Sequence, residues 1–334
     1  AAYINERQIQ TLAGAGRAKA KAFAAELDGI EARYHVDHSI ILAIWGRETN
    51  YGGYDLPHNA LRVIATQAFL GTRKDYFRNE LLWALKIIED GHVTKAGMKS
   101  SWAGAMGLTQ FMPTNFRDFA VDFDGDGRRD IWNSVPDSLA STAKSLSTPK
   151  NVEGQDMTWN NQVSWGYEVV APKDADCTLQ GFAAPRPIRD WVELGYARTR
   201  GRAFPSELLD EPAYLMLPEG TYGPAFLLTR NFLILKTYNF ADLYALFVGH
   251  LADRIAGGGP FDTPWATTKP MRERDVYALQ QKLAKLGHDV GKVDGKVGWR
   301  SRVALGLFEK ANDLAVDCYP TTDDVAAAKK VAAN

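Results

Sequence analysis

The chain has 334 residues, of which 46% are hydrophobic and 24% charged, and its 39 basic and 40 acidic residues give a formal net charge of -1. This balance excludes a protein that binds nucleic acid through an overall positive charge, and the length predicts two or three globular domains. No stretch reaches the roughly 20 apolar residues of a membrane-spanning helix, and no charged and apolar leader opens the chain, so we expect neither a transmembrane nor a signal segment in it.

The N-terminal part is predicted to be helical. Residues 17–35, rich in Ala, Lys and Glu, indicate a first helix, and a second begins near Asp37 or Ser39, since either residue can cap it. Gly52 and Gly53 are expected to end this second helix, because glycine adopts left-handed backbone conformations cheaply. A third helix is predicted over residues 76–89.

The later part mixes strands and helices. Between about 150 and 230, Pro, Gly and short β-branched or aromatic runs predict short strands and loops. Residues 240–255 form a strongly apolar helix pattern, and residues 256–270 have the Gly, Pro and Thr content of a linker. Three short helices follow, the first with one apolar helical stripe that ends at a glycine. That stripe consists of Val276, Leu279, Leu283 and Leu286, before Gly287.

Glu48 is the first candidate catalytic residue. In the sequence AIWGRETNYGG it follows Ile44 by four residues and Trp45 by three, so the three side chains share one helical face. That face is apolar, and removal of the carboxyl from water raises its pKa, as a general acid for glycoside cleavage requires. The alternative is a glutamate at a frayed helix end that extends into solvent and pairs with Arg47 or a neighbour.

A second stretch, SSWAGAMGLTQFMPTNF over residues 100–116, is typical of a site for an amphipathic sugar ring. Its glycines would let the backbone approach a ligand closely. The side chains offered to the sugar are an amide, an aromatic ring and a thioether: Gln110, Phe111 and Met112. The alternative is a tight turn into a helix at Thr114, with Phe111 and Met112 in the core.

Together the two stretches resemble the membrane-bound lytic transglycosylase B family of peptidoglycan-cleaving enzymes. The resemblance continues through VDFDGDGRRDIWNSVPDSLAS and PEGTYGPAFLLTRNFLILKTYNFADLYALFVGHLADR into the C-terminal module. It implies an α+β, mostly helical fold, with a lysozyme-like catalytic domain over residues 1–256, a linker over 257–270 and a small three-helix domain over 271–334. The implied substrate is the β(1→4) bond between N-acetylmuramic acid and N-acetylglucosamine.

The resemblance makes Glu48 the sole catalytic carboxylate. It would protonate the glycosidic oxygen and then, as a base, accept the proton of the C6 hydroxyl of the same muramic residue, which closes a 1,6-anhydro ring without water. Attack within one molecule replaces an external nucleophile, whereas a retaining hydrolase needs a second carboxyl about 5 Å away. In the sequence near Glu48 no second acid has a comparable apolar setting, and Asp55 is merely the nearest. No cofactor is expected for catalysis.

The same resemblance implies residues that contact the substrate. Ser101 would hydrogen-bond near the acid or the bound sugar, while Gln110, Phe111 and Met112 would line the glycan cleft. Tyr238, in the sequence KTYNF, matches an aromatic residue near the catalytic glutamate. A core tyrosine is the alternative there, and the preceding Thr237 stands where members often have Arg.

The acidic sequence DFDGDGRRDIWN predicts a structural calcium site. Aspartates occupy loop positions one, three, five and nine, and Gly127 stands at position six for the turn. Position twelve is Asn133 and not the usual glutamate, so the family's extended loop over 122–137 suggests a further aspartate as the last ligand. The predicted ligands are Asp122, Asp124, Asp126, the Arg128 carbonyl, Asp130 and Asp137. The alternatives are a solvated acidic turn and, for Asp137, a capping box with Ser134.

The C-terminal module resembles the peptidoglycan-binding domain type 1. Gly298-Trp299 stands where that family usually has Gly-Pro, and Asp317-Cys318 where it usually has Asp-Gly. The alternative is a small bundle that only stabilises or spaces the enzyme. Cys177 and Cys318 fit no metal or redox motif, and two cysteines neither demand nor exclude an oxidising compartment.

The expected partner is the peptidoglycan glycan strand, and we expect a monomer in the periplasm of a Gram-negative cell envelope. Two rival functions stay open. One is a hydrolytic muramidase acting on the same bond, and the other is a non-catalytic protein that only binds the cell wall.

Overall fold

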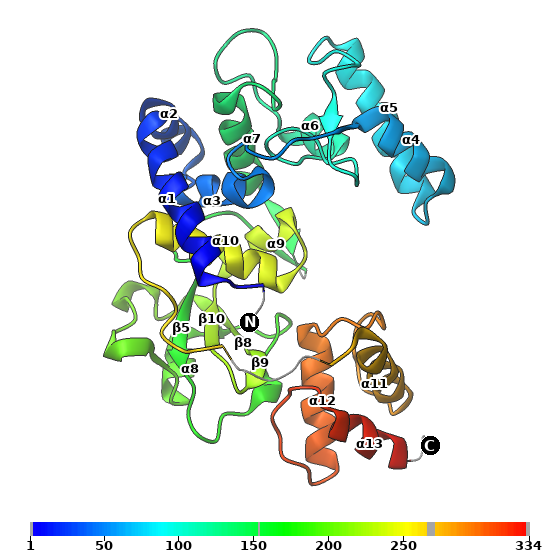
Figure 1. Cartoon of the computed structure of the whole chain (residues 1–334). Helices are drawn as coiled ribbons and strands as arrows, with labels where there is room; N and C mark the ends of the chain where they lie inside the picture. Colours follow the sequence, from blue (N-terminus) through cyan, green and yellow to red (C-terminus); the bar gives the residue numbers. More distant parts are fainter. Residues whose placement is uncertain (1–2, 153, 266–270, 332–334) are drawn as a thin grey trace. The chain divides into compact units, whose positions relative to one another are not determined.

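A computed structural model describes the chain except for residues 1–2, 153, 266–270 and 332–334 (Figure 1). Its described residues form 13 α-helices and three small sheets, which confirms the predicted α+β, mostly helical class. By compactness the chain divides into a helical unit, residues 5–162 with 245–259, and a sheet unit, residues 1–4 with 163–244 and 260–334. Among the described residues, no helix is long and apolar enough to cross a membrane.

The helical unit consists of helices with two small two-stranded sheets. In it α1 packs against α3, α2 against α7 and α4 against α5. A hydrogen bond of Glu6 with His250 (2.6 Å) and an ion pair of Glu6 with Arg254 (2.9 Å) join α1 to α10. The elements are α1 (Glu6–Ala22), α2 (Ala24–Tyr34), α3 (His38–Thr49), β1 (His58–Asn59), α4 (Ala60–Leu70), α5 (Lys74–Glu89), β2 (Lys99–Ser100), α6 (Pro113–Phe119), α7 (Val135–Ser147), β3 (Lys150–Val152), β4 (Gln155–Met157) and most of α10 (Asp242–Ile255).

The first predicted helix is interrupted. Residues 17–35 belong to two helices, because Phe23 leaves the helical conformation with φ -120° and ψ 31°. The ring of Phe23 packs edge-on against Trp45 of α3, with centroids 6.1 Å apart. Tertiary packing thus overrides a local composition that favours an unbroken helix. The predicted helices near 76–89 and 240–255 are confirmed as α5 and α10.

The sheet unit is built on a five-stranded antiparallel sheet with strand order β6-β8-β10-β5-β7. This confirms the short strands predicted between 150 and 230. Its core contains Trp191, Tyr196 and Leu227, all buried. The elements are β5 (Gly166–Val170), η1 (Cys177–Leu179), β6 (Arg186–Pro187), α8 (Ile188–Glu193), β7 (Ala197–Arg198), η2 (Thr199–Gly201), η3 (Ser206–Leu208), β8 (Pro212–Met216), β9 (Pro218–Thr221), β10 (Ala225–Leu228) and α9 (Arg230–Tyr238).

The three predicted C-terminal helices are confirmed as α11 (Glu273–Lys285), α12 (Trp299–Ala311) and α13 (Thr322–Lys330). Leu279 and Leu283 of the predicted stripe are buried against Leu305 and Phe308 of α12. Gly287 has a φ of 90°, a left-handed value that suits the glycine just after α11.

A disulfide joins this C-terminal domain to the rest of the sheet unit. Cys177 in η1 and Cys318, in the loop between α12 and α13, are bonded, with Cα atoms 6.1 Å apart. Beside it, a Cβ on Gly306 would come within 2.4 Å of the Cys318 sulfur, so only glycine leaves room there. The sequence alone left the state of these cysteines open.

The described part of the predicted linker, residues 257–265, forms no helix or strand. The backbone N–H groups of Asp262 and Thr263 donate to the Glu168 carboxylate on β5, at 2.8 and 2.6 Å. The ring of Phe261 packs on Phe226 of β10. Residues 261–263 therefore lie along the sheet, and residues 266–270 lie outside the described residues.

Candidate active site

Glu48 lies in the last turn of α3 and is half-buried. The helix begins as predicted, because the Asp37 side chain accepts a hydrogen bond from the Ser39 N–H at 2.7 Å. Nine of its twelve residues are buried, and a helix packed in this way holds the Glu48 side chain partly out of water. The neighbouring Arg47 places its guanidinium over the Phe247 ring, 4.8 Å from the centroid. Glu48 is thus partly shielded from solvent, and its catalytic role stays a prediction.

The end of α3 differs from the prediction. Asn50 and Tyr51 already take left-handed conformations, with φ of 50° and 56°, before Gly52 at 80°. The N–H groups of Asn50 and Tyr51 bond to the carbonyls of Gly46 and Trp45. Asparagine tolerates this conformation, but tyrosine rarely adopts it without outside support. The two glycines therefore follow the turn and do not start it.

Tyr51 receives that support from its side chain. Its hydroxyl donates to the carbonyl of Leu12 at 2.9 Å, and its ring packs edge-on against Trp45. Burial raises the pKa of the Tyr51 hydroxyl, so the group stays a donor. A Cβ on Gly46 would lie 2.6 Å from the Tyr51 ring, and one on Gly16 2.6 Å from its oxygen. Two glycines on α1 and α3 thus make the space that fixes the chain just after Glu48.

The loop over residues 100–112 is closed by its own hydrogen bonds. Met106 and Phe111 exchange backbone hydrogen bonds at 2.8 and 3.1 Å, and the Ser101 N–H donates to the Ala105 carbonyl at 2.8 Å. The side-chain amide of Gln110 donates to the carbonyls of Ala105 and Gly107. This makes a compact loop whose backbone is set before any ligand arrives.

The glycines of this loop are needed by the protein itself. A Cβ on Gly107, which has a φ of 63°, would lie 2.4 Å from the Ile131 carbonyl oxygen. A Cβ on Gly104 would lie 2.9 Å from the Ile64 side chain. The close approach expected for a ligand is therefore made by neighbouring chain segments.

The loop and the end of α3 are in contact. The Thr49 hydroxyl donates to the carbonyl of Leu108 at 3.4 Å, and Gly52 approaches the Leu108 side chain. Thr49 is the residue directly after Glu48. The helical unit therefore brings together the two stretches that the sequence singled out.

The acidic loop brings together three of its six predicted ligands. Carboxylate oxygens of Asp122, Asp124 and Asp137 lie within 4.8 Å of one another. Asp137 is fully buried on α7 and accepts from the N–H groups of Phe123, Asp124 and Asp130. Ser134 caps α7 as predicted, and its hydroxyl accepts from the Asp137 N–H. The Asp137 carboxylate accepts from the three other N–H groups and not from the Ser134 N–H, so the two residues do not form a capping box.

Two further predicted ligands, the carboxylates of Asp126 and Asp130, lie outside this group, and the Arg128 carbonyl as a ligand stays a prediction. Asp126 forms an ion pair with the guanidinium of Arg128 at 2.7 Å. Asp130 accepts hydrogen bonds from Trp132 and from the backbone and side chain of Asn133.

Comparison with known proteins places this arrangement in a family. The model of the transglycosylase SLT domain matches residues 1–253, and that of a peptidoglycan binding domain matches residues 272–327. The chain belongs to the transglycosylase SLT domain family. Within it, the chain is 30% identical over 224 residues to membrane-bound lytic murein transglycosylase B of Escherichia coli (strain K12), a match that covers 67% of this chain and 58% of that relative's length.

Solved structures of this family extend the likeness. SltB3 from Pseudomonas aeruginosa, in complex with NAG-anhNAM-pentapeptide, is 38% identical with a TM-score of 0.87, over 98% of this chain and 85% of that one. The Escherichia coli lytic transglycosylase Slt35 in complex with calcium has a TM-score of 0.61 at 24% identity, over 76% of each chain. At that identity the second likeness is one of fold alone.

The residues that the sequence predicted to contact the substrate differ in their exposure to solvent. Ser101, Gln110 and Met112 are half-buried, whereas Phe111 is only 3% exposed and packs edge-on to Phe119. Phe111 thus matches the alternative of a core side chain. Tyr238 ends α9 in the sheet unit and is half-buried. The contacts of these residues with glycan stay predictions.

Replacing Gly46 with alanine is expected to lower activity and stability together. The new methyl group would meet the Tyr51 ring, and an overpacked core costs about 1–3 kcal/mol. Tyr51 would have to move, and with it the turn that follows Glu48. We expect the turnover number to fall by about tenfold or more, measured on purified peptidoglycan.

Gly14→Ala on α1 is the matched control, because a Cβ there meets nothing within 4 Å. If Gly46→Ala kept the stability and turnover of Gly14→Ala, the packing of Tyr51 against Gly46 would not be what fixes the turn after Glu48.

Proposed function

We propose that this chain is a lytic transglycosylase that cleaves the β(1→4) bond between N-acetylmuramic acid and N-acetylglucosamine in peptidoglycan. The observation that carries the proposal is Glu48, a half-buried carboxyl at the end of a buried helix, inside the part of the chain matched by the transglycosylase family. The nearest acid in sequence, Asp55, is exposed and lacks such a setting.

In the proposed reaction Glu48 acts twice. Its carboxyl proton passes to the glycosidic oxygen as the bond to the muramic C1 breaks, and N-acetylglucosamine leaves with a hydroxyl. The Glu48 carboxylate then accepts the proton of the muramic C6 hydroxyl as that oxygen bonds to C1. The 1,6-anhydro ring closes, Glu48 is protonated again, and no water is consumed. Attack by a group already held in the substrate supplies the rate advantage of an intramolecular reaction.

Product analysis tests this proposal against its nearest rival. Incubation with purified sacculi should release muropeptides with 1,6-anhydro ends, each lighter by one water than a hydrolytic product. Mass spectrometry distinguishes them. Reducing muramic ends would instead favour a hydrolytic muramidase, and the absence of any cleavage would favour a protein that only binds the cell wall.

We further propose that the acidic loop holds a structural calcium ion. Calcium prefers carboxylate oxygens, and the three clustered carboxylates of Asp122, Asp124 and Asp137 would repel one another without a cation. These three residues would hold the ion, with no part in the chemistry. Its effect would be to link the loop at residues 122–124 to the start of α7.

Calcium is therefore expected to raise the thermal unfolding midpoint of the chain relative to EDTA. An ion at 100 times its Kd adds about 2.7 kcal/mol of stability. The variant D122N/D124N should lose this response, while the control Asp75→Asn, at an exposed position on α5, should keep it. A midpoint that stays the same in about 10 mM calcium and in EDTA would contradict a calcium site.

The remaining parts of the proposal concern the C-terminal domain, the oligomeric state and the cellular location. We propose that the C-terminal domain binds peptidoglycan and that the chain works as a monomer in the periplasm. The disulfide is consistent with an oxidising compartment. Light scattering after size exclusion tests the monomer, and fractionation of the producing cell tests the location.

A further inference from the structure

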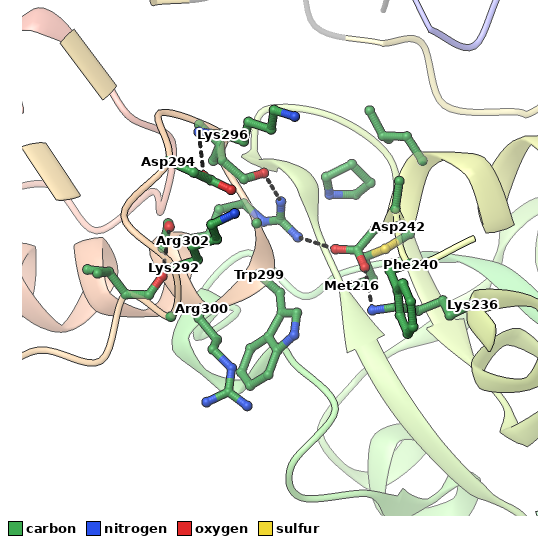
Figure 2. Close-up of a pocket in the computed structure, with 18 of the residues that line it drawn as sticks. Met216, Lys236, Phe240, Asp242, Lys292, Asp294, Lys296, Trp299, Arg300 and Arg302 are labelled. Carbon is green, nitrogen blue, oxygen red and sulfur yellow. Dashed lines mark hydrogen bonds and ion pairs between the residues drawn. The ribbon is translucent and has the colours of Figure 1, made fainter. Parts of the chain in front are cut away.

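The sheet unit contains a cavity of about 640 Å³ that has no part in the proposed cleavage (Figure 2). One wall comes from the peptidoglycan binding domain, through residues between 290 and 302 at the start of α12. The other comes from the turn between α9 and α10, with Met216 at the end of β8. The disulfide and a hydrogen bond from Arg302 to Gln180 (2.8 Å) hold the peptidoglycan binding domain to the rest of the sheet unit.

The cavity walls carry an excess of positive charge. Five cationic side chains face two carboxylates there: Lys236, Lys292, Lys296, Arg300 and Arg302 against Asp242 and Asp294. Lys236 is paired with Asp242 at 2.7 Å, and Arg300 with Asp289 outside the cavity at 2.7 Å. Lys292 and Lys296 are exposed and have no ion pair among the described residues. In a chain of net charge -1 this local excess favours an anionic ligand.

Arg302 provides a buried donor whose hydrogen bonding is incomplete. The side chain is only 4% exposed, and its Nη2 has no hydrogen-bond partner among the described residues. Nη2 forms an ion pair with the Asp242 carboxylate at 3.9 Å (Figure 2), a distance too long for a hydrogen bond, so the N–H groups of Nη2 stay without an acceptor in the described part of the chain. A buried guanidinium with an unmatched N–H is costly, and an anion in the cavity would satisfy it.

The start of α12 adds to the positive electrostatic potential in the cavity. Its N-cap is Gly298, which has no side chain to accept from the first N–H groups of the helix. A helix of 13 residues carries partial positive charge at this end, and its unbonded N–H groups suit a carboxylate.

The rest of the lining is apolar. Phe240 is 85% exposed at the edge of the cavity, and Trp299 and Val297 lie opposite on the peptidoglycan binding domain. The occupant should therefore carry small apolar groups as well as negative charge, a combination found in a short peptide with a free terminal carboxylate.

We propose that this cavity binds the C-terminal carboxylate of a peptidoglycan stem peptide. The identity of the peptide rests on the proposed function, whereas the preference for a carboxylate comes from the cavity itself. The carboxylate is bound by Arg302, Lys292, Lys296 and the N-terminus of α12. Phe240 contacts the small apolar groups of the peptide. The enzyme thereby holds strands by their peptides, through residues other than those proposed to cleave the sugar chain.

Calorimetry on the full chain tests the proposal, with the stem pentapeptide and the same peptide as its C-terminal carboxamide. The free acid should bind at least tenfold more tightly than the carboxamide, and salt should weaken its binding. The variant K292A/K296A should lose at least tenfold in affinity. The control K329A/K330A removes the same charge from exposed positions on α13 and should bind within twofold of the wild type.

Three results would overturn the proposal: no binding of the pentapeptide, equal binding of acid and carboxamide, or equal affinity of K292A/K296A and its control. Displacement of the peptide by an equal concentration of inorganic phosphate would show a general anion site and would overturn the peptide assignment.

A second readout separates this proposal from the proposed function. K292A/K296A should still cleave glycan strands that carry no peptide, at the wild-type rate and with anhydro ends. Failure of the peptide experiment would leave that cleavage intact, and failure of cleavage by the wild type would leave the peptide affinity intact.

Discussion

The variant Glu48→Gln is expected to lower the turnover of purified peptidoglycan by about 10³-fold or more, with little change in KM. General acid–base catalysis by one side chain contributes about 10²–10⁴-fold, and here a single carboxyl would serve both proton transfers. Glutamine keeps the size of the side chain but neither donates an acidic proton nor accepts one. A loss confined to the turnover number would indicate an interaction made in the transition state and not in the bound substrate.

Glu89→Gln is the matched control, because Glu89 ends α5 as an exposed member of an ion pair with Lys86. It should cleave sacculi as the wild type does, and both variants should have the circular dichroism of the wild type. If Glu48→Gln kept more than a tenth of the wild-type turnover, Glu48 would not be the catalytic acid. If wild type and variant were equally inactive while both bound sacculi, the chain would be a wall-binding protein.

Helices whose apolar residues repeat with helical spacing could be predicted from the sequence. The stripe through Leu279 and Leu283 predicted α11 because burial on one face requires that spacing. Asp37 as N-cap and the apolar run before Glu48 predicted α3 for the same local reasons. The acidic spacing predicted that Asp122 and Asp124 would cluster, as they do, but it also predicted Asp126 and Asp130, which lie outside the cluster, while Asp137 was predicted from the family resemblance.

Local structures that depend on contacts with residues distant in the sequence could not be predicted from the sequence. The turn after Glu48 depends on Tyr51, whose left-handed conformation is held by Leu12 on α1. The start of α6 depends on Glu80 of α5, a fully buried carboxylate that accepts from the N–H and hydroxyl of Thr114 at 2.9 and 2.7 Å. A glutamate in a helix full of charges gives no signal that it faces inward. The roles of Ser101 and Tyr238, which stay predictions, were proposed through the family resemblance.

Loss of the disulfide is expected to destabilise the sheet unit by about 5 kcal/mol, because a cross-link across 141 residues removes much of the freedom of the unfolded chain. Both sulfurs are fully buried, so serine would also place hydroxyls in the core. The variant C177S/C318S should therefore unfold at markedly lower urea than the wild type, and reduction of the wild type should lower its midpoint in the same direction. Glu48 and the acidic loop belong to the helical unit, so the calcium response of the variant should remain.

The conformation of Cys318 allows a sharper test of the same prediction. Cys318 has a φ of 55°, in the left-handed region that glycine adopts at least cost. The double variant C177S/C318G should thus be more stable than C177S/C318S by about 1 kcal/mol, since glycine avoids the backbone strain that other residues incur at position 318. Both should remain well below the wild type, because neither can restore the cross-link. Equal stability of C177S/C318G and the wild type would mean that relief of backbone strain outweighs the disulfide, and the cross-link would then not be what stabilises this unit.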